Sequence, residues 1–302
     1  MAILSATPQH QLFTHPTQAS LSFLPASIVQ LFIMHFATTL ALAGVATAFA
    51  IEPRAEVKKF PKGTIFDMVL DSSKLQLSDF QKSKAPVLSI DLDDNYGIIK
   101  TLAKTKTVLC YFSAGSYEDW RDDKDLFKKG DYGKALDPRW EGEYWINVKS
   151  DNVKSIMEKR IIKAKEAGCH GVDPDNVDGY NPEKEGEPPQ DGFNYGQTPY
   201  VDYIKFLALK AHENDLAIGL KNAVELVGRL VGTVDYAMNE QCHFYNECAA
   251  YEVFTDADKA VFNVEYELTE CPEPTANTTI VTILKDSNQQ VDTLDLPCPE
   301  SG

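Results

Sequence analysis

The sequence predicts an α/β protein folded as a single (β/α)8 TIM barrel. Three observations indicate this fold: short β-type runs alternate with amphipathic helical stretches, eight such runs occur, and residues 51–302, about 250 residues, have the usual length of one such barrel. Because strands that alternate with helices pair in parallel, the eight units are expected to close on themselves.

The expected barrel strands are short runs rich in apolar and β-branched residues. They cover residues 64–70, 87–90, 107–112, 144–148, 169–172, 217–220, 235–238 and 260–264.

The helices between these strands follow from the spacing of apolar residues. In residues 152–168 apolar side chains recur at helical intervals with Lys and Glu between them, and Gly168 supplies the stop. Residues 199–215 repeat the pattern. The stretch 181–193, rich in Pro, Gly and Glu, is expected to form a loop at the barrel rim.

The first 50 residues differ from the rest, because they contain no Asp, Glu, Lys or Arg. The apolar stretch 34–50 ends in Ala48-Phe49-Ala50, a pattern typical of a signal-peptidase site. The stretch lacks the basic n-region that signal peptides usually have. One way to reconcile this with export is that Met34 is the true start and residues 1–33 are an extension of the gene model. The alternative is an uncleaved anchor over residues 28–50, nearly long enough to span a bilayer. With either, residues 51–302 face the secretory lumen or the exterior, and the protein is expected to be secreted or held at the cell surface.

The net charge of −16 belongs entirely to residues 51–302. It argues against a nucleic-acid partner, whose phosphates require a basic face. A polycationic partner would be favoured instead, although acidity can also serve only to keep an exported protein soluble. No protein partner is implied, and a monomer is expected.

Six cysteines in an oxidising compartment predict disulfides. The pairs expected are Cys242–Cys248 and Cys271–Cys298. Cys110 and Cys169 lie inside apolar runs and are interpreted as buried free thiols.

The sequence contains candidates for two other kinds of site. A metal site formed by Cys242, His243 and Cys248 is a weak alternative to the first disulfide, and no metal or other cofactor is expected. The sequence "NTT" makes Asn277 an N-glycosylation acceptor if the chain is exported.

Acidic residues recur where the predicted strands end. They are Asp91, Asp93, Asp173, Asp175, Glu240 and Glu265, and Lys221 ends another strand. The carboxyl ends of barrel strands converge on one mouth, where the chemistry of such barrels is located. Crowded carboxylates are tolerated where one must be neutral and another ionised, and a lysine offsets part of their repulsion.

Two carboxyl groups around a polar substrate indicate glycoside hydrolysis, in which one protonates the leaving oxygen and the other attacks the anomeric carbon or activates water. Aromatic residues near the strand ends offer surfaces on which sugars stack: Tyr111, Tyr117, Trp120, Trp145 and Tyr180. Each feature also has a structural interpretation. An Asp after a strand is often a helix cap or turn former, Trp145 is expected in the core, and Glu118 with Arg121 forms an i,i+3 ion pair.

Five motifs, in order, resemble those of glycoside hydrolase family 114, the endo-α-1,4-polygalactosaminidases. They are "VLCYFSAGSYEDWR" (108–121), "GCHGVDPDNVDGY" (168–180), "GLKN" (219–222), "NEQCHFYNEC" (239–248) and "KAVFNVEY" (259–266). The resemblance covers residues 60–298. It implies a secreted or surface-anchored barrel that cleaves α-1,4-linked galactosamine inside a cationic exopolysaccharide, and such a substrate suits the acidic chain.

The resemblance also implies roles for single residues. Asp175 matches the family's nucleophile position and Glu240 its acid/base position, and the likeness of "PDN" (174–176) to α-galactosidase barrels favours retention. The residues expected to contact substrate are Asp91, Asp93, Tyr111, Tyr117, Trp120, Asp173, Asn176, Tyr180, Lys221 and Glu265.

Three positions depart from the family pattern. The family often has Asp where His170 stands, and Arg and Asp where this chain has Tyr144 and Asn147. Both expected catalytic positions are kept, so these departures bear on subsite preference, such as tolerance of acetylation.

Three alternative functions remain open from the sequence. One is an α-galactosidase-like hydrolase of neutral or N-acetylated galactosides that uses the same two acids. Another is a non-catalytic barrel that binds polysaccharide without cleaving it. A metal-dependent hydrolase is the weakest, because no histidines of residues 51–302 are paired at ligand spacing.

Overall fold

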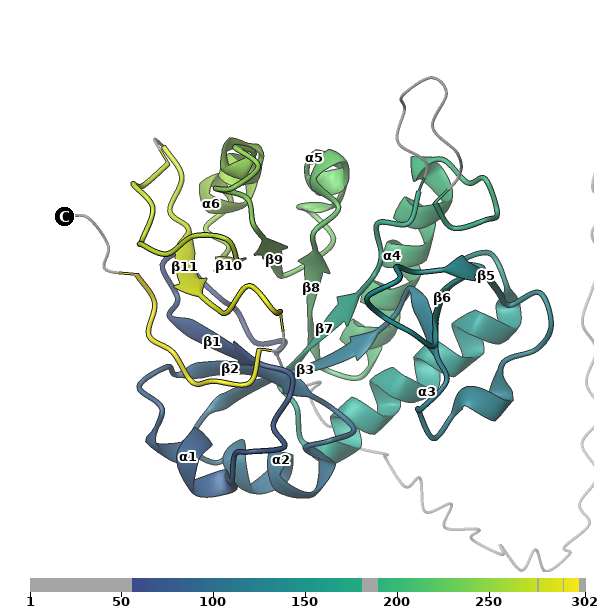
Figure 1. The fold of residues 1–302 in the computed structure, drawn as a ribbon, viewed down its shortest axis with the longest axis horizontal. Coiled ribbons are helices and arrows are strands. Elements are labelled where there is room, and N and C mark those ends of the chain that lie inside the picture. Colours follow the sequence, from purple (N-terminus) through teal and green to yellow (C-terminus); the bar gives the residue numbers. More distant parts are fainter. Residues whose placement is uncertain (1–55, 181–189, 276, 290, 299–302) are drawn as a thin grey trace, which may run out of the picture. The chain divides into compact units, whose positions relative to one another are not determined.

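A computed structural model describes residues 56–180, 190–275, 277–289 and 291–298 (Figure 1). The expected signal peptide or anchor lies outside the described residues, as does most of the expected rim loop. Everything below concerns the described part of the chain.

The core of the fold is an eight-stranded, all-parallel sheet curved into a nearly closed barrel, as the sequence predicts. Its strands, in order around the sheet, are β1 (Phe66–Val69), β2 (Val87–Asp91), β3 (Thr107–Ser113), β7 (Gly171–Asp175), β8 (Ala217–Lys221), β9 (Tyr236–Glu240), β10 (Val261–Glu265) and β11 (Val281–Leu284). Seven of these coincide with predicted strands.

The prediction of a barrel strand at 144–148 is wrong. These residues contribute to β6 (Glu143–Ile146), the middle strand of a separate antiparallel sheet with β4 (Ser116–Glu118) and β5 (Tyr132–Ala135). This small sheet is inserted between β3 and the helix that follows it (Figure 1). The sequence could not distinguish the two cases, because a half-buried strand has the same composition in either sheet.

The missing eighth strand is β11, and side chains join it to β1. Among the described residues no backbone ladder links the two strands. Instead Lys285, directly after β11, donates to the buried Asp67 of β1 at 2.7 Å and to Asp295 at 2.8 Å. The backbone N–H of Asp295 also donates to Asp67, at 2.7 Å. The yellow C-terminal segment therefore runs beside β1 (Figure 1).

Helices lie against the outside of the sheet. They are α1 (Leu77–Lys82), α2 (Tyr96–Leu102), α3 (Asp151–Ala167), α4 (Gln197–Glu213), α5 (Val227–Leu230) and α6 (Glu252–Asp256). The two long ones match the predicted helices. The backbone N–H of Val153 donates to the side chain of Ser150 at the start of α3, and Gly168 ends that helix in the left-handed conformation, with φ of 97°.

Two apolar layers follow from the alternation of side chains along each strand. Residues such as Met68, Leu109 and Phe262 fill the barrel interior, whereas Cys110 and Val261 pack between sheet and helices. Every second strand residue therefore points into the barrel, and this alternation determines which strand-end residues reach its mouth.

The expected disulfides Cys242–Cys248 and Cys271–Cys298 are present, but the prediction of free thiols was wrong. Cys110 and Cys169 form a third disulfide, with their Cα atoms 6.0 Å apart. Cys110 lies on β3, and Cys169 lies two residues before the start of β7, the neighbour of β3 in the sheet. The burial of a cysteine in an apolar run does not exclude a disulfide, because adjacent strands can bring two buried cysteines together.

The variant Cys110→Ala/Cys169→Ala should lose about 4 kcal/mol of folding stability, because the disulfide closes a loop of 59 residues. Thermal unfolding under oxidising conditions measures the loss. The matched variant Cys242→Ala/Cys248→Ala opens a loop of 6 residues and should lose about 2 kcal/mol. Equal losses in the two variants would contradict the loop-length argument.

Two expectations about localisation concern the surface of the molecule. Asn277 is exposed in a turn, a position that a glycan can reach. Its use as a glycosylation acceptor stays a prediction. In the described part of the chain no helix is both long and apolar enough to cross a bilayer, and the expected anchor lies outside it.

Candidate active site

The crowded aspartates of the motif "DPDN" are explained by the alternation along β7. Asp173 and Asp175 lie two residues apart, so both point into the barrel. Asp173 is fully buried and accepts a hydrogen bond from Ser89 on β2 at 3.1 Å. Burial raises the pKa of Asp173 to about 6, against the opposing effect of Lys221.

A buried lysine stands between the two expected catalytic carboxylates. The Lys221 Nζ atom, at the end of β8, lies 3.3 Å from Asp175 Oδ2 and 3.7 Å from Glu240 Oε2. Burial alone would lower the pKa of Lys221, but Asp175, Glu240 and Asp173 together raise it well above its usual value. Lys221 is therefore a permanent cation that offsets part of the carboxylate repulsion.

Glu240, at the end of β9, is held by three donors. Tyr266 Oη donates to its Oε1 at 2.6 Å and Asn222 Nδ2 to its Oε2 at 2.9 Å, while Lys221 attracts the same oxygen. Burial raises the pKa of Glu240, but Lys221, Tyr266 and Asn222 outweigh it and lower the pKa below the usual value. Glu240 is thus ionised at neutral pH when no substrate is bound.

Asp175 and Glu240 face each other across the barrel mouth. Because both contact Lys221 Nζ, their nearest oxygens are at most about 7 Å apart, an upper limit compatible with the carboxyl pairs of glycosidases. Both line a cleft of about 280 Å³. Its other lining residues include Tyr111, Trp140, Glu143, Trp145, Asn176, Asp178, Asn222 and Tyr266.

A close backbone contact positions the end of β7, which carries Asp175. The amide groups of Ala114 and Gly115 both donate to the carbonyl oxygen of Asp175, at 2.9 Å. A Cβ atom at Gly115 would lie 1.5 Å from the carbonyl oxygen of Asn176, so only glycine fits there. Asn176 itself is left-handed, with φ of 60°, and its amide group donates to Ser113 Oγ at 2.9 Å.

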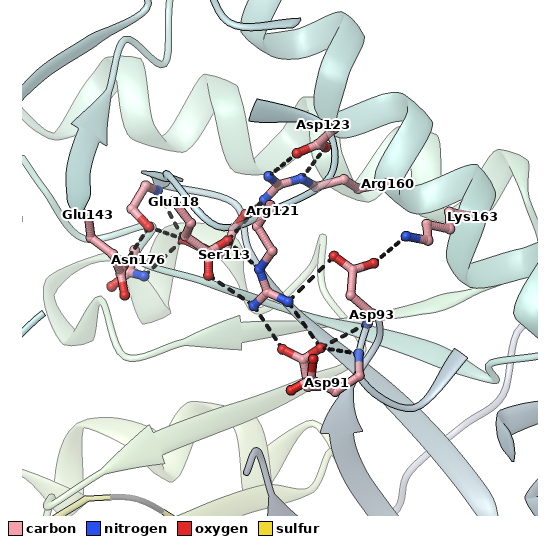
Figure 2. A network of polar contacts seen from close by, with 12 residues as sticks. Asp91, Asp93, Ser113, Glu118, Arg121, Asp123, Glu143, Arg160, Lys163 and Asn176 are labelled. Atoms are coloured by element: carbon pink, nitrogen blue, oxygen red, sulfur yellow. Dashed lines mark hydrogen bonds and ion pairs between the residues drawn. The ribbon is translucent and has the colours of Figure 1, made fainter. Parts of the chain in front are cut away.

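Asp91 and Asp93 do not line the cleft, contrary to the prediction that they contact substrate. Figure 2 shows that both bind Arg121. Arg121 forms paired hydrogen bonds with Asp91, at 2.8 and 3.1 Å, and with Glu118, at 2.9 and 3.0 Å. Lys163 binds the other oxygen of Asp93. These acids therefore belong to a buried structural network, as expected for Glu118 with Arg121.

Glu265 is also absent from the cleft. Its strand neighbour Val264 points into the barrel, so Glu265 points outward. The side chain is fully buried and accepts the backbone N–H groups of His243, at 2.8 Å, and Phe244, at 3.4 Å. Glu265 thus fixes the loop that follows Glu240.

The predicted aromatic contacts divide into two groups. Tyr117 stacks on Tyr132 in the small antiparallel sheet, with ring centroids 4.4 Å apart, and neither it nor the exposed Trp120 lines the cleft. Tyr111 does line it, with Lys221 Nζ 5.4 Å from its ring centroid. Tyr180 is buried and donates to Glu225 beside the cleft.

Several cleft residues were not predicted. Tyr266 and Asn222 stand inside quoted motifs, directly after a strand and after Lys221, and that position was the available signal. Trp140 lies in a loop without periodicity, which gave no signal. Glu143 was missed because the strand that it begins, β6, was assigned to the barrel. Burial raises the pKa of Glu143 to about 7, and Ser116 Oγ donates to it at 2.8 Å.

The three departures from the family pattern lie away from the cleft. His170, Tyr144 and Asn147 are not among its described lining residues, and His170 Nδ1 accepts the backbone N–H of Val108 at 3.1 Å. Trp145, expected in the core, is 4% exposed, yet it borders the cleft and its indole N–H has no partner among the described residues.

The candidate metal ligands have another use. Cys242, His243 and Cys248 lie close together, but the two sulfur atoms are bonded to each other. That bond leaves no thiolate for a metal ion.

An eight-stranded parallel barrel with two carboxylates facing each other in its mouth is the architecture of a glycoside hydrolase. The chain belongs to glycoside-hydrolase family GH114, whose family model matches residues 46–299. This confirms the resemblance found in the sequence motifs.

Solved structures agree with the family assignment. The chain is 33% identical to Aspergillus fumigatus Ega3, solved in complex with galactosamine, over 81% of this chain and 98% of that one, with a TM-score of 0.65. The glycoside hydrolase domain of Pseudomonas aeruginosa PelA is 11% identical over 76% of this chain and 97% of that one, with a TM-score of 0.56, and this likeness shows the fold alone. A search of curated proteins finds no match.

Proposed function

We propose that this glycoside hydrolase cleaves α-1,4-linked galactosamine polymers at internal bonds. The observation that carries the proposal is the facing pair Asp175 and Glu240 in one cleft, with Lys221 between them. The galactosamine complex of Ega3, a relative at 33% identity, supports this substrate class. So does the net charge of −16, which would attract a cationic polymer.

In the proposed mechanism, Asp175 attacks the anomeric carbon while Glu240 gives its proton to the departing glycosidic oxygen. The bond to the leaving sugar breaks as the bond to Asp175 forms. Glu240, now ionised, then takes a proton from water, whose oxygen attacks the same carbon and releases Asp175. The two displacements retain the anomeric configuration. Lys221, 3.3 Å from Asp175 Oδ2, holds the attacking carboxyl group in place.

To act as the general acid, Glu240 must carry a proton. Because its pKa is lowered, only a small fraction of the enzyme has Glu240 protonated at neutral pH. The profile of kcat/KM should therefore fall on its alkaline side within the acid range. In Lys221→Met the cation that stabilises ionised Glu240 is gone, so the pKa of Glu240 rises and the alkaline limb should move to higher pH. Initial rates measured across pH test this. Lys62→Met, at an exposed position, should leave the limb in place, and an unmoved limb in Lys221→Met would contradict the role of Lys221.

We further propose that the protein acts outside the cell. Three disulfides support an oxidising compartment. A deacetylated galactosamine polymer is too large to enter a cell, so an enzyme that cleaves it internally must meet it in the exterior or at the surface.

Incubation with purified galactosaminogalactan, followed by mass spectrometry of the released oligomers, tests the function directly. Oligomers of galactosamine should appear, whereas galactan and fully N-acetylated polymer should release little. Cleavage of the neutral or acetylated polymers instead would indicate an α-galactosidase-like enzyme. Tight binding of the polymer without release of any oligomers would indicate a non-catalytic barrel.

A further inference from the structure

A second pocket, of about 330 Å³, adjoins the catalytic cleft. Asp178 and Asn222 line both spaces, so a polymer chain held in the cleft can continue into the pocket. Much of the remaining wall comes from the segments that follow β8 and β9, including Glu225, Tyr245 and Glu247.

Three carboxyl groups line this pocket, and among the described residues none of them is in direct contact with a cation. Asp178, Glu225 and Glu247 form no ion pair with a lysine or arginine of the described residues. The other acids near the mouth differ, since Asp175 and Glu240 share Lys221, and Asp91 binds Arg121. Burial and the neighbouring Asp175 raise the pKa of Asp178 to about 7, and burial together with Glu225 raises that of Glu247. A cationic ligand would relieve both effects.

A buried acceptor in the same wall independently indicates a ligand. Asn239 is 1% exposed and lines the pocket, and its Nδ2 donates to Tyr251 Oη at 2.8 Å, which fixes the orientation of the amide. Its Oδ1 has no hydrogen-bond partner among the described residues. Such an oxygen is costly to leave unpaired, and a donor placed in the pocket would satisfy it.

An aromatic ring borders the pocket. Tyr245 is 60% exposed and packs edge-to-face against Phe244, with ring centroids 5.1 Å apart. An exposed ring beside carboxylates offers the apolar face of a sugar a stacking surface, while the acids receive its polar groups.

We propose that this pocket binds the protonated amine of the sugar unit next to the one held between Asp175 and Glu240, through Asp178, Glu225, Glu247 and the Oδ1 of Asn239. The assignment rests on the proposed function. An ammonium group supplies three donors and a positive charge, which match one amide oxygen and unbalanced carboxylates. An N-acetylated amine supplies one donor and no charge, so the pocket selects for deacetylated polymer.

Calorimetric titration of a galactosamine tetramer into Asp175→Asn, which binds without cleaving, tests the proposal. Adding Glu247→Gln should weaken binding about tenfold, because a charge-assisted hydrogen bond is lost. Glu225→Gln tests the opposite wall and should weaken binding in the same direction. The matched control Glu166→Gln, exposed on α3, should leave the affinity unchanged. Thermal unfolding of each variant verifies the fold.

Unchanged affinity in both Glu247→Gln and Glu225→Gln would overturn the proposal. An equal loss of affinity for the N-acetylated tetramer would also overturn it, since that result would indicate shape and not charge. The outcome is separate from the hydrolase proposal. Glu247-dependent binding by a protein that releases no oligomers would refute only the hydrolase, whereas hydrolysis with Glu247-independent binding would refute only the pocket.

Discussion

Asp175→Asn and Glu240→Gln are each expected to lose activity on polygalactosamine by a factor on the order of 10⁴ while they remain folded. Asparagine cannot form the bond to the anomeric carbon, and glutamine cannot deliver a proton. The fold should persist because the hydrogen bond from the backbone N–H of Asn176 to Asp175 Oδ1, at 2.8 Å, can also be accepted by an amide oxygen. In each variant buried Lys221 keeps one anionic partner, Glu240 or Asp175. Reducing-end assays measure the rates.

A matched control separates the loss of chemistry from the loss of a charge. Asp202→Asn makes the same substitution at an exposed position on α4 and should retain full activity. Circular dichroism and thermal unfolding should show no large change in any of the three variants. Ordinary turnover by Asp175→Asn or Glu240→Gln would remove that residue from the mechanism.

The second large effect is expected on stability. Arg121→Met should lower the free energy of unfolding by about 3–5 kcal/mol, because it leaves the buried carboxylates of Asp91 and Glu118 without their shared cation. Burial already raises the pKa of Glu118, and the loss of Arg121 would raise it further, although Arg160 still pairs with Glu118 at 3.5 Å. Chemical denaturation measures the change.

An exposed ion pair provides the comparison. Arg139 binds Asp137 at 2.9 Å, but its side chain is 68% exposed, so Arg139→Met should cost less than about 1 kcal/mol. A similar small loss in Arg121→Met would show that the network in Figure 2 does not stabilise the fold.

The fold was largely predictable because the barrel is encoded locally. Alternating runs and helical spacing identified seven strands and both long helices. The error came from β6 and β11, two strands of four residues each. The predicted strand β1 is equally short, so length alone does not explain the error. The composition of a strand does not show whether it joins the barrel or a separate small sheet.

The candidate site was predictable only where a residue's position on its strand determined its direction. Asp173, Asp175, Lys221 and Glu240 point into the barrel because of where they fall in the alternation. Asp91 also points inward, but its partner Arg121 comes from a different part of the chain. Long-range pairing of that kind has no local signature, and neither has the disulfide between Cys110 and Cys169.

The seam between β1 and β11 has a consequence for the order in which the protein is made. Asp67 belongs to the first strand, whereas Asp295, which binds it, comes more than two hundred residues later. The N–H of Cys298 donates to Thr282 of β11 at 2.7 Å, and its sulfur binds Cys271. Until these residues leave the ribosome, the emerging barrel keeps an open edge. Formation of the disulfide between Cys271 and Cys298 would then hold the closed edge together.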